Sequence, residues 1–240
     1  MFRHQGKART FLHNLRLAAL LSLVAGIVNI TGVLALQTLT TNVTGHFAYF
    51  AEEITKHNYG IAVTFLFFTF CFLLGSFTAS TLVEMVLKRK PRLAYVVPIT
   101  LEISILIAVA LFFTPASIAV WQGKIAAFLL LFAMGVQNSL VTKVSQSTVR
   151  TTHLTGLFTD LGIELSQLFF YKKEEQQRKL KNNIYLRFSI IAFFFIGCVL
   201  GGFVYGSAGI RTLFLASAIL VIALYYDYIR LKIYSITRVH

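Results

Sequence analysis

Residues 17–36 read LAALLSLVAGIVNITGVLAL, a continuous apolar run without a charged side chain. A helix rises 1.5 Å per residue, so roughly twenty apolar residues cross a hydrocarbon layer about 30 Å thick. Basic residues precede this run, and no clear small-residue cleavage site interrupts it. We therefore expect a retained membrane span here and not a signal peptide.

Five more stretches of this kind follow along the chain, at about 60–83, 93–113, 124–141, 184–205 and 210–230. The chain of 240 residues is 57% hydrophobic, whereas only 13% of its residues are charged, about half the share in a soluble domain. Backbone polar groups inside lipid must be satisfied within the chain, and these runs lack the alternation of barrel strands. The predicted fold is an all-α polytopic membrane helix bundle with six transmembrane helices.

Two shorter segments, about 43–56 and 153–170, have a helical pattern but are too polar or too short to span. The first contains His46, Glu52 and Glu53, and the second contains Asp160, Glu164 and Gln167. Such segments are tolerated at membrane depth only where protein or water covers them. We expect two short re-entrant or interfacial helices.

The formal net charge of +13 would suggest nucleic-acid binding in a soluble protein. Here the basic residues cluster at the N-terminus, at 88–92, in the loop at 172–181 and in the C-terminal tail. With six spans, all four clusters fall on one side of the membrane. The positive-inside rule makes that side the cytoplasm, with both termini there and no nucleic-acid partner.

The two halves of the chain resemble each other. The heptapeptide TNVTGHF at 41–47 parallels THLTGLF at 152–158, and in that register Glu53 falls opposite Glu164. Upstream, GIVN at 26–29 parallels GVQN at 135–138. Downstream, LGSF at 74–77 is matched to LGGF at 200–203.

This internal similarity predicts two three-span repeats within a single membrane domain covering 1–240, at about 17–113 and 124–230. Because each repeat has an odd number of spans, the second enters the membrane from the opposite side. Inverted repeats of this kind are typical of secondary transporters. The alternative is a duplication that produced only a stable helix bundle.

The motifs at 26–29 and 41–46, together with AMGVQN at 133–138 and VRTTHLTG at 149–156, resemble the YoaK family. The resemblance covers roughly 15–230 and implies an uncharacterised multi-spanning protein of the bacterial cytoplasmic (inner) membrane, classed as a domain of unknown function. That family tends to have an acidic residue at Asn29, Met at Val43 and Asn at His46. The missing acid argues against a proton-carrying role for position 29.

Polar groups inside the spans are the first site candidates. Asn29 and the pair Gln137 and Asn138 lie at repeat-equivalent places, and an amide in hydrocarbon needs a partner or a wet cavity. They either surround a central substrate site or act as hydrogen bonds between helices.

The second set of candidates lies where the two short helices begin, and comprises Asn42, Thr44, His46, His153 and Thr155. Threonine and asparagine cap free N–H groups there, and helix N-termini carry partial positive charge. In transporters with broken helices these ends face the substrate, whereas elsewhere a capping residue simply starts a helix.

Three acids are candidates for ion or proton coupling. Glu102 lies near the middle of the third apolar stretch, where an ionisable group is a functional candidate by default, although a structural pair or a silent protonated carboxyl is the alternative. Glu53 and Glu164 are repeat-equivalent. Glu164 and Asp160 share a helical face that either meets a cavity or forms the wet side of an interfacial helix.

Other features suggest packing or solvation. Cys71 and Cys198 are expected to be packing residues, and GCVLG at 197–201 fits close helix contacts across the repeat interface or in a homodimer. The charged segment 171–183 is expected to be a cytoplasmic loop.

The sequence predicts no enzyme, metal site or cofactor, because it has no nucleophile–base set, phosphate-binding loop or zinc-ligand pattern. The partners expected are the lipid bilayer and an unknown small solute. The leading hypothesis is a small-solute transporter working by alternating access, and the alternative is a non-transporting structural or sensory subunit with a cytoplasmic partner.

Overall fold

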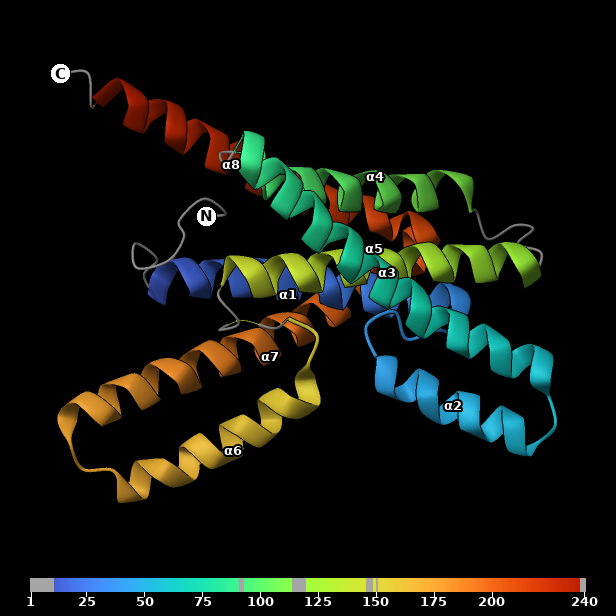
Figure 1. Ribbon diagram of the computed structural model, residues 1–240, viewed down its shortest axis with the longest axis horizontal. Helices are drawn as coiled ribbons and strands as arrows, with labels where there is room; N and C mark the ends of the chain where they lie inside the picture. The colour runs from blue at the N-terminus through green and yellow to red at the C-terminus, as the bar shows by residue number, and fades with distance from the viewer. Residues whose placement is uncertain (1–10, 91–92, 114–119, 146–148, 150, 238–240) are drawn as a thin grey trace.

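The computed structural model describes residues 11–90, 93–113, 120–145, 149 and 151–237. Helices are the regular secondary structure found over these residues, so the all-α prediction is confirmed (Figure 1). The elements are α1 Phe11–Leu36, α2 Val43–Thr55, α3 Tyr59–Arg89, α4 Val96–Phe112, α5 Val120–Val144, α6 Leu154–Phe170, α7 Glu174–Ala208, the 3-10 helix η4 Gly209–Thr212, and α8 Leu213–Thr237.

Helices α1, α3, α5 and α7 extend beyond the predicted apolar stretches at their charged ends, whereas α4 lies within its predicted stretch. The clearest difference is at 171–183, predicted as a loop, where α7 already begins at Glu174 and runs unbroken into the apolar part. Glu, Gln, Lys and Arg are good helix formers, and Glu174 and Glu175 in the first turn complement the helix dipole. The loop prediction was wrong because polarity was taken as a sign of irregular structure.

Apolar helices dominate the molecule. Within the residues that the structure describes, four stretches are long and apolar enough to cross a membrane, namely α1, α3, 121–144 within α5, and 174–226, which contains α7 and most of α8. Helix α4 is apolar but has only 17 residues. Only 22% of the α3 window is buried within the chain, so its large apolar side chains point outward. A helix that exposes such a surface needs lipid around it, and the chain is a membrane protein.

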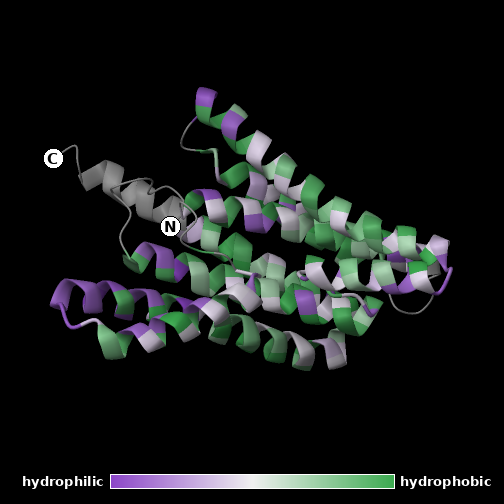
Figure 2. Cartoon of the chain, turned by 60° about the horizontal axis from the view of Figure 1, so that its bottom comes forward, coloured by the Kyte–Doolittle hydropathy of each residue, from purple (hydrophilic) through white to green (hydrophobic). Residues whose placement is uncertain are grey.

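Hydropathy also varies along the length of the bundle. Figure 2 shows hydrophobic colours over the middle of the helices and hydrophilic colours at their ends, most strongly at the turn between α6 and α7. This is the distribution expected of helices that cross a hydrocarbon layer with their ends in water.

Two close helix pairs, α1 with α7 and α3 with α5, form the centre of the packing. A Cβ atom on Gly26 would overlap the carbonyl oxygen of Phe194, and one on Gly135 would overlap that of Phe72. Reciprocally, a Cβ on Gly197 would overlap the Leu23 carbonyl, and one on Gly75 the Phe132 carbonyl. These four glycines let the backbones touch, as small residues do between membrane helices.

These contacts correct one alignment made from the sequence. The match of 74–77 with 200–203 would pair Gly75 with Gly201. In the structure Gly197 makes the contact that corresponds to that of Gly75, one helical turn earlier. The predicted small-residue pattern at 197–201 therefore serves packing between α7 and α1.

Helices α2 and α6 begin in the middle of the molecule and run in opposite directions along its long axis (Figure 1). Helix α6 runs toward the end where α1 begins and α8 finishes, and α2 runs toward the other end. Each packs on the helix that follows it, α2 on α3 and α6 on α7.

Candidate functional site

The start of α2 is fixed by the way α1 ends. Gln37 has a φ of 52°, and the Thr38 amide bonds the Gly32 carbonyl at 3.2 Å, which closes α1 with a left-handed residue. The chain then turns back, and the Asn42 side chain accepts a hydrogen bond from the Gly45 amide at 3.0 Å. Asn42 is thus the N-cap of α2, as the sequence predicted.

The start of α6 has a related arrangement with a different side chain. His153 occupies the N-cap position without a side-chain capping bond, and its ring lies against Gly156 so closely that a Cβ there would overlap it. In α2 the Asn42 side chain lies against Gly45 in the same way. Both glycines leave room for the preceding cap residue.

Side-chain amides of α1 and α5 form hydrogen bonds with the segments that lead into α2 and α6. The Thr41 hydroxyl donates to Asn29 Oδ1 at 2.9 Å, and the Thr151 hydroxyl donates to Asn138 Oδ1 at 3.3 Å. The Asn138 amide also donates to the Thr152 hydroxyl. Asn29 and Asn138 therefore perform the same task in the two halves, which is to hold the segment leading into a short helix.

One cavity of about 1220 Å³ lies between the two helix starts. Its polar side is formed by the starts of α2 and α6 and by the end of α5, and its apolar side by α3 and Phe47. The lining residues are Thr41, Asn42, Val43, Thr44, Phe47, Leu66, Phe67, Thr69, Phe70, Phe72, Leu73, Ser76, Asn138, Thr142, Thr152, His153, Leu154, Thr155, Gly156 and Thr159. Of the predicted substrate-binding residues, Asn42, Thr44, Asn138, His153 and Thr155 lie in this lining.

Two lining hydroxyls have no partner within the described chain. Thr44 and Thr155 occupy equivalent places in the first turns of α2 and α6, and both are exposed to the cavity. Most of the other threonine and serine hydroxyls of the lining bond carbonyls or Asn29, as Thr69 does with the Leu66 carbonyl and Ser76 with that of Gly135. Thr44 and Thr155 can therefore bond a molecule in the cavity.

Three predicted substrate-binding residues lie outside the lining. Asn29 lies behind it and acts through Thr41. Gln137 is fully buried, and its amide donates to the Leu21 carbonyl at 2.9 Å. His46 is buried against Phe65 and Phe68, with Nε2 within 2.7 Å of the Leu39 carbonyl, so it secures the segment before α2.

Glu102 is buried in α4, with both carboxylate oxygens unpaired among the described residues. It shares its helix face with Ile99, Ile103 and Leu106, which belong to the main apolar core. Glu102 lies outside the cavity lining.

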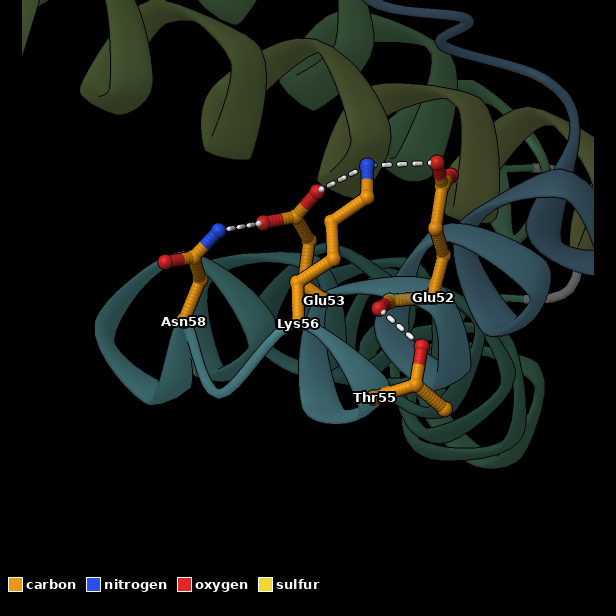
Figure 3. Close-up of polar contacts among 5 residues, drawn as sticks. All are labelled: Glu52, Glu53, Thr55, Lys56 and Asn58. Atoms are coloured by element: carbon orange, nitrogen blue, oxygen red, sulfur yellow. Dashed lines mark hydrogen bonds and ion pairs between the residues drawn. The ribbon is translucent and has the colours of Figure 1, made fainter.

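Glu53 helps to close the turn between α2 and α3 (Figure 3). It accepts a hydrogen bond from the Asn58 amide at 2.9 Å, and Lys56 Nζ lies between Glu53, at 3.4 Å, and Glu52, at 2.6 Å. The hydrogen bond to Glu52 raises the pKa of the Lys56 ammonium. In this arrangement Glu53 has a local structural partner.

Glu164 has a partner on the neighbouring helix. Arg187 of α7 lies 2.9 Å from Glu164 and 3.1 Å from Asp160, both on α6, so one guanidinium bridges the two acids. The positions corresponding to Asp160 and Arg187 in the first half are Tyr49 and Phe65, whose rings lie 5.2 Å apart. The same helix–helix contact is thus ionic in one half and aromatic in the other.

Sequence reasoning missed the α3 side of the cavity and the role of Arg187. Nothing in an apolar stretch marks Phe67, Phe70 or Leu73 as cavity residues, because lipid-facing side chains have the same composition. Thr142 was accessible to sequence reasoning, because it lies one helical turn after Asn138 on the same face.

Among the described residues no three His, Cys, Asp or Glu side chains gather as metal ligands, and Cys71 and Cys198 are not joined in a disulfide.

Comparison with known protein families gives a match over most of the chain. The family model described as "Protein of unknown function (DUF1275)" matches residues 17–226. No curated protein and no solved structure matches. The match covers both halves of the chain, including the starts of α2 and α6.

Proposed function

Since the chain belongs to this DUF1275 family, whose description names no substrate, we propose from its geometry that it is a small-solute transporter or permease. It would work by alternating access between two inverted halves, with the solute held at the starts of α2 and α6. In this proposal the protein moves its solute without chemical conversion and is not an enzyme.

One observation carries the proposal. The hydroxyls of Thr44 and Thr155 enter one cavity from two helices and have no partner among the described residues. A hydroxyl without a hydrogen bond is costly in an apolar environment. Water or a solute must therefore satisfy these groups, which is what a binding site between re-entrant helices requires.

The packing supports the inverted-repeat part of the proposal. Exchanging the halves converts the pair α1 and α7 into the pair α5 and α3, and it converts the Asn29–Thr41 bond into the Asn138–Thr152 bond. The opposite directions of α2 and α6 in Figure 1 agree with this exchange. A pseudo-two-fold axis in the membrane plane gives two equivalent conformations, one open to each side.

The proposed topology has six spans, namely α1, α3, α4, α5, α7 and α8. The ends that carry Lys88, Arg89 and the basic residues at 178–181 of α7 would lie in the cytoplasm, as would both termini, and the membrane would be the bacterial inner membrane. Glu102 would be the candidate for proton coupling, because it alone among the three predicted acids lacks any partner among the described residues.

Cysteine labelling tests the proposal. In a Cys71→Ala/Cys198→Ala background, Thr44→Cys and Thr155→Cys would be labelled with an impermeant maleimide added to one side at a time. Asn58→Cys would mark the outside and Gln176→Cys the cytoplasm. Alternating access predicts that both cavity cysteines react from either side, each more slowly than the marker of that side.

Strict one-sided reaction of both cavity cysteines would contradict the proposal. It would favour the alternative, a structural or sensory subunit whose cytoplasmic partner binds the exposed, charged start of α7. Labelling of Asn58→Cys and Gln176→Cys from the same side would contradict the inverted topology itself.

A further inference from the structure

The cavity between α2, α3 and α6 has a chemical composition that restricts what it can hold. Among its described lining residues there is no carboxylate, lysine or arginine, and His153 is the one ionisable side chain of that set. A charged group placed in such a site would lose its hydration without gaining an ion pair. The polar part of the ligand is therefore expected to be uncharged.

The polar groups are concentrated on one side of the cavity. Thr44 and Thr155 offer hydroxyls without partners in the described part of the chain, where the Asn42 amide uses only its oxygen, in the cap of α2. The hydroxyl of Thr142, in contrast, is already bonded to the Asn138 carbonyl. This arrangement suits a small head group with hydroxyl or carbonyl oxygens that both accept and donate hydrogen bonds.

The opposite side is aromatic and aliphatic, and it leads outward. Phe67, Phe70 and Leu73 on α3 line the cavity, yet they are 51%, 54% and 63% exposed, and Phe47 on α2 is 53% exposed. These three α3 residues lie well inside a 31-residue candidate membrane span. At that depth, the parts of these side chains that do not face the cavity would contact the hydrocarbon of the bilayer, which would give the cavity a side open to lipid.

We propose that the cavity binds an uncharged amphipathic molecule, which enters from the bilayer between α3 and α6 with its head group at Thr44 and Thr155 and its apolar part along α3. This inference rests on the proposed function, because it names the substrate class of the same site. The cavity volume of about 1220 Å³ exceeds the usual range for compact ligands, about 300–1,000 Å³, and leaves room for a chain beside the head group.

Fluorescence quenching in a bilayer tests this inference without knowledge of the natural ligand. The chain has a single tryptophan, Trp121, so a Trp121→Phe background allows one reporter at a time. Phe70→Trp places the reporter at the cavity mouth. Phe195→Trp is the matched control, because Phe195 is 67% exposed on α7 and is not part of the lining.

Both variants would be reconstituted in nanodiscs of phosphatidylcholine brominated in the acyl chains. We expect quenching at both positions, because both face hydrocarbon. Added monoacylglycerol should relieve the quenching at position 70 saturably and leave position 195 unchanged. A fatty acid anion and an alkyltrimethylammonium of the same chain length should be at least about tenfold weaker, since the described lining offers no carboxylate, lysine or arginine as a counter-charge.

Replacing both hydroxyls, Thr44→Val with Thr155→Val, should weaken the monoacylglycerol response about tenfold. The control pair Thr78→Val with Thr81→Val removes hydroxyls that bond the Leu74 and Phe77 carbonyls outside the cavity, and it should leave the response unchanged. If the cavity variant fails to fold, the comparison of neutral with charged ligands in the unaltered site still decides the question.

Several results would overturn the inference. They are the absence of saturable relief at position 70, tighter binding of either charged analogue, and the absence of lipid quenching at position 70 while position 195 is quenched. The last result would mean that protein, such as a second copy of the chain, covers the mouth. Two-sided labelling of Thr44→Cys and Thr155→Cys combined with no relief would leave the transport proposal standing with a different solute class.

Discussion

The hydroxyl of Ser76 on α3 donates a hydrogen bond to the carbonyl oxygen of Gly135 on α5, 3.0 Å away. The thiol of Cys198 on α7 lies 3.4 Å from the carbonyl oxygen of Gly26 on α1. Both bonds are made beside a glycine that allows two backbones to touch. Enlarging a side chain at these glycine contacts should therefore lower the stability of the protein more than it would elsewhere in the packing.

Adding a methyl group at these contacts should destabilise the protein. Gly135→Ala and Gly26→Ala would each push a backbone carbonyl, which cannot rotate away, and should cost about 1–3 kcal/mol. Thermal unfolding of the purified protein would measure this as a lower unfolding temperature. Gly162→Ala and Gly206→Ala are the controls, because a Cβ at either meets nothing within 4 Å. They should stabilise their helices by about 0.5–1 kcal/mol.

Removing the threonine hydroxyl that bonds Asn29 should lower the stability of the protein more than removing one of the two threonine hydroxyls that bond Asn138. Thr41→Val removes the hydrogen bond to Asn29 Oδ1 and should cost about 1 kcal/mol. Thr152→Val leaves Asn138 bonded to Thr151 and should cost less. Unfolding temperatures of the two variants, with Thr78→Val as a neutral control, would check the order. Equal losses would show that Thr151 does not compensate.

Replacing Arg187 should weaken the packing of α6 against α7. Arg187→Ala leaves Glu164 and Asp160 without their common partner, and we expect a loss of about 1–3 kcal/mol, because the Arg187 side chain is only 23% exposed. Faster proteolysis within 154–170 would report it. The matched double variant Arg187→Phe with Asp160→Tyr copies the aromatic contact of Tyr49 with Phe65 and should recover part of the loss. A double variant no better than Arg187→Ala would contradict this account.

Substitutions of Glu102 should affect the stability of the protein and its transport activity differently. Because both of its oxygens are buried without a partner among the described residues, Glu102→Leu should leave stability unchanged or raise it by about 1 kcal/mol. If Glu102 couples transport to protons, Glu102→Gln should fold normally but lose proton-driven uptake. Unfolding temperature and vesicle uptake measured on the same preparations would test both. A severe folding defect in Glu102→Gln would show that the carboxyl has a structural role.

The helical architecture was predictable because helices surrounded by lipid need long runs of apolar side chains, and such runs are visible in the sequence. The stretches at 17–36 and 60–83 correspond to α1 and α3, and the segments 43–56 and 153–170 correspond to α2 and α6 within a few residues. The repeated heptapeptides also led to the helix starts at Asn42 and His153, because capping is a local property of the chain.

What the sequence could not provide were contacts between distant segments. The difference between Gly197 and Gly201 is one helical turn, and both residues suit close packing, so composition does not choose between them. The pairing of Arg187 with Glu164 joins residues on consecutive helices through a turn whose geometry the sequence does not specify. His46 was expected at the substrate, but its ring bonds the Leu39 carbonyl because the turn before α2 passes directly over it.

The crossed pairing of α1 with α7 and of α3 with α5 also orders events during synthesis. Gly26 leaves the ribosome long before Phe194, whose backbone it touches. At about 5–20 residues per second, the first helix waits on the order of ten to thirty seconds for its partner. Until then its glycine face has only lipid or insertion machinery to cover it. Helix α3 meets α5 much sooner. The nascent protein should therefore acquire its central contacts in two stages, first between α3 and α5 in the middle of the chain and later between α1 and α7.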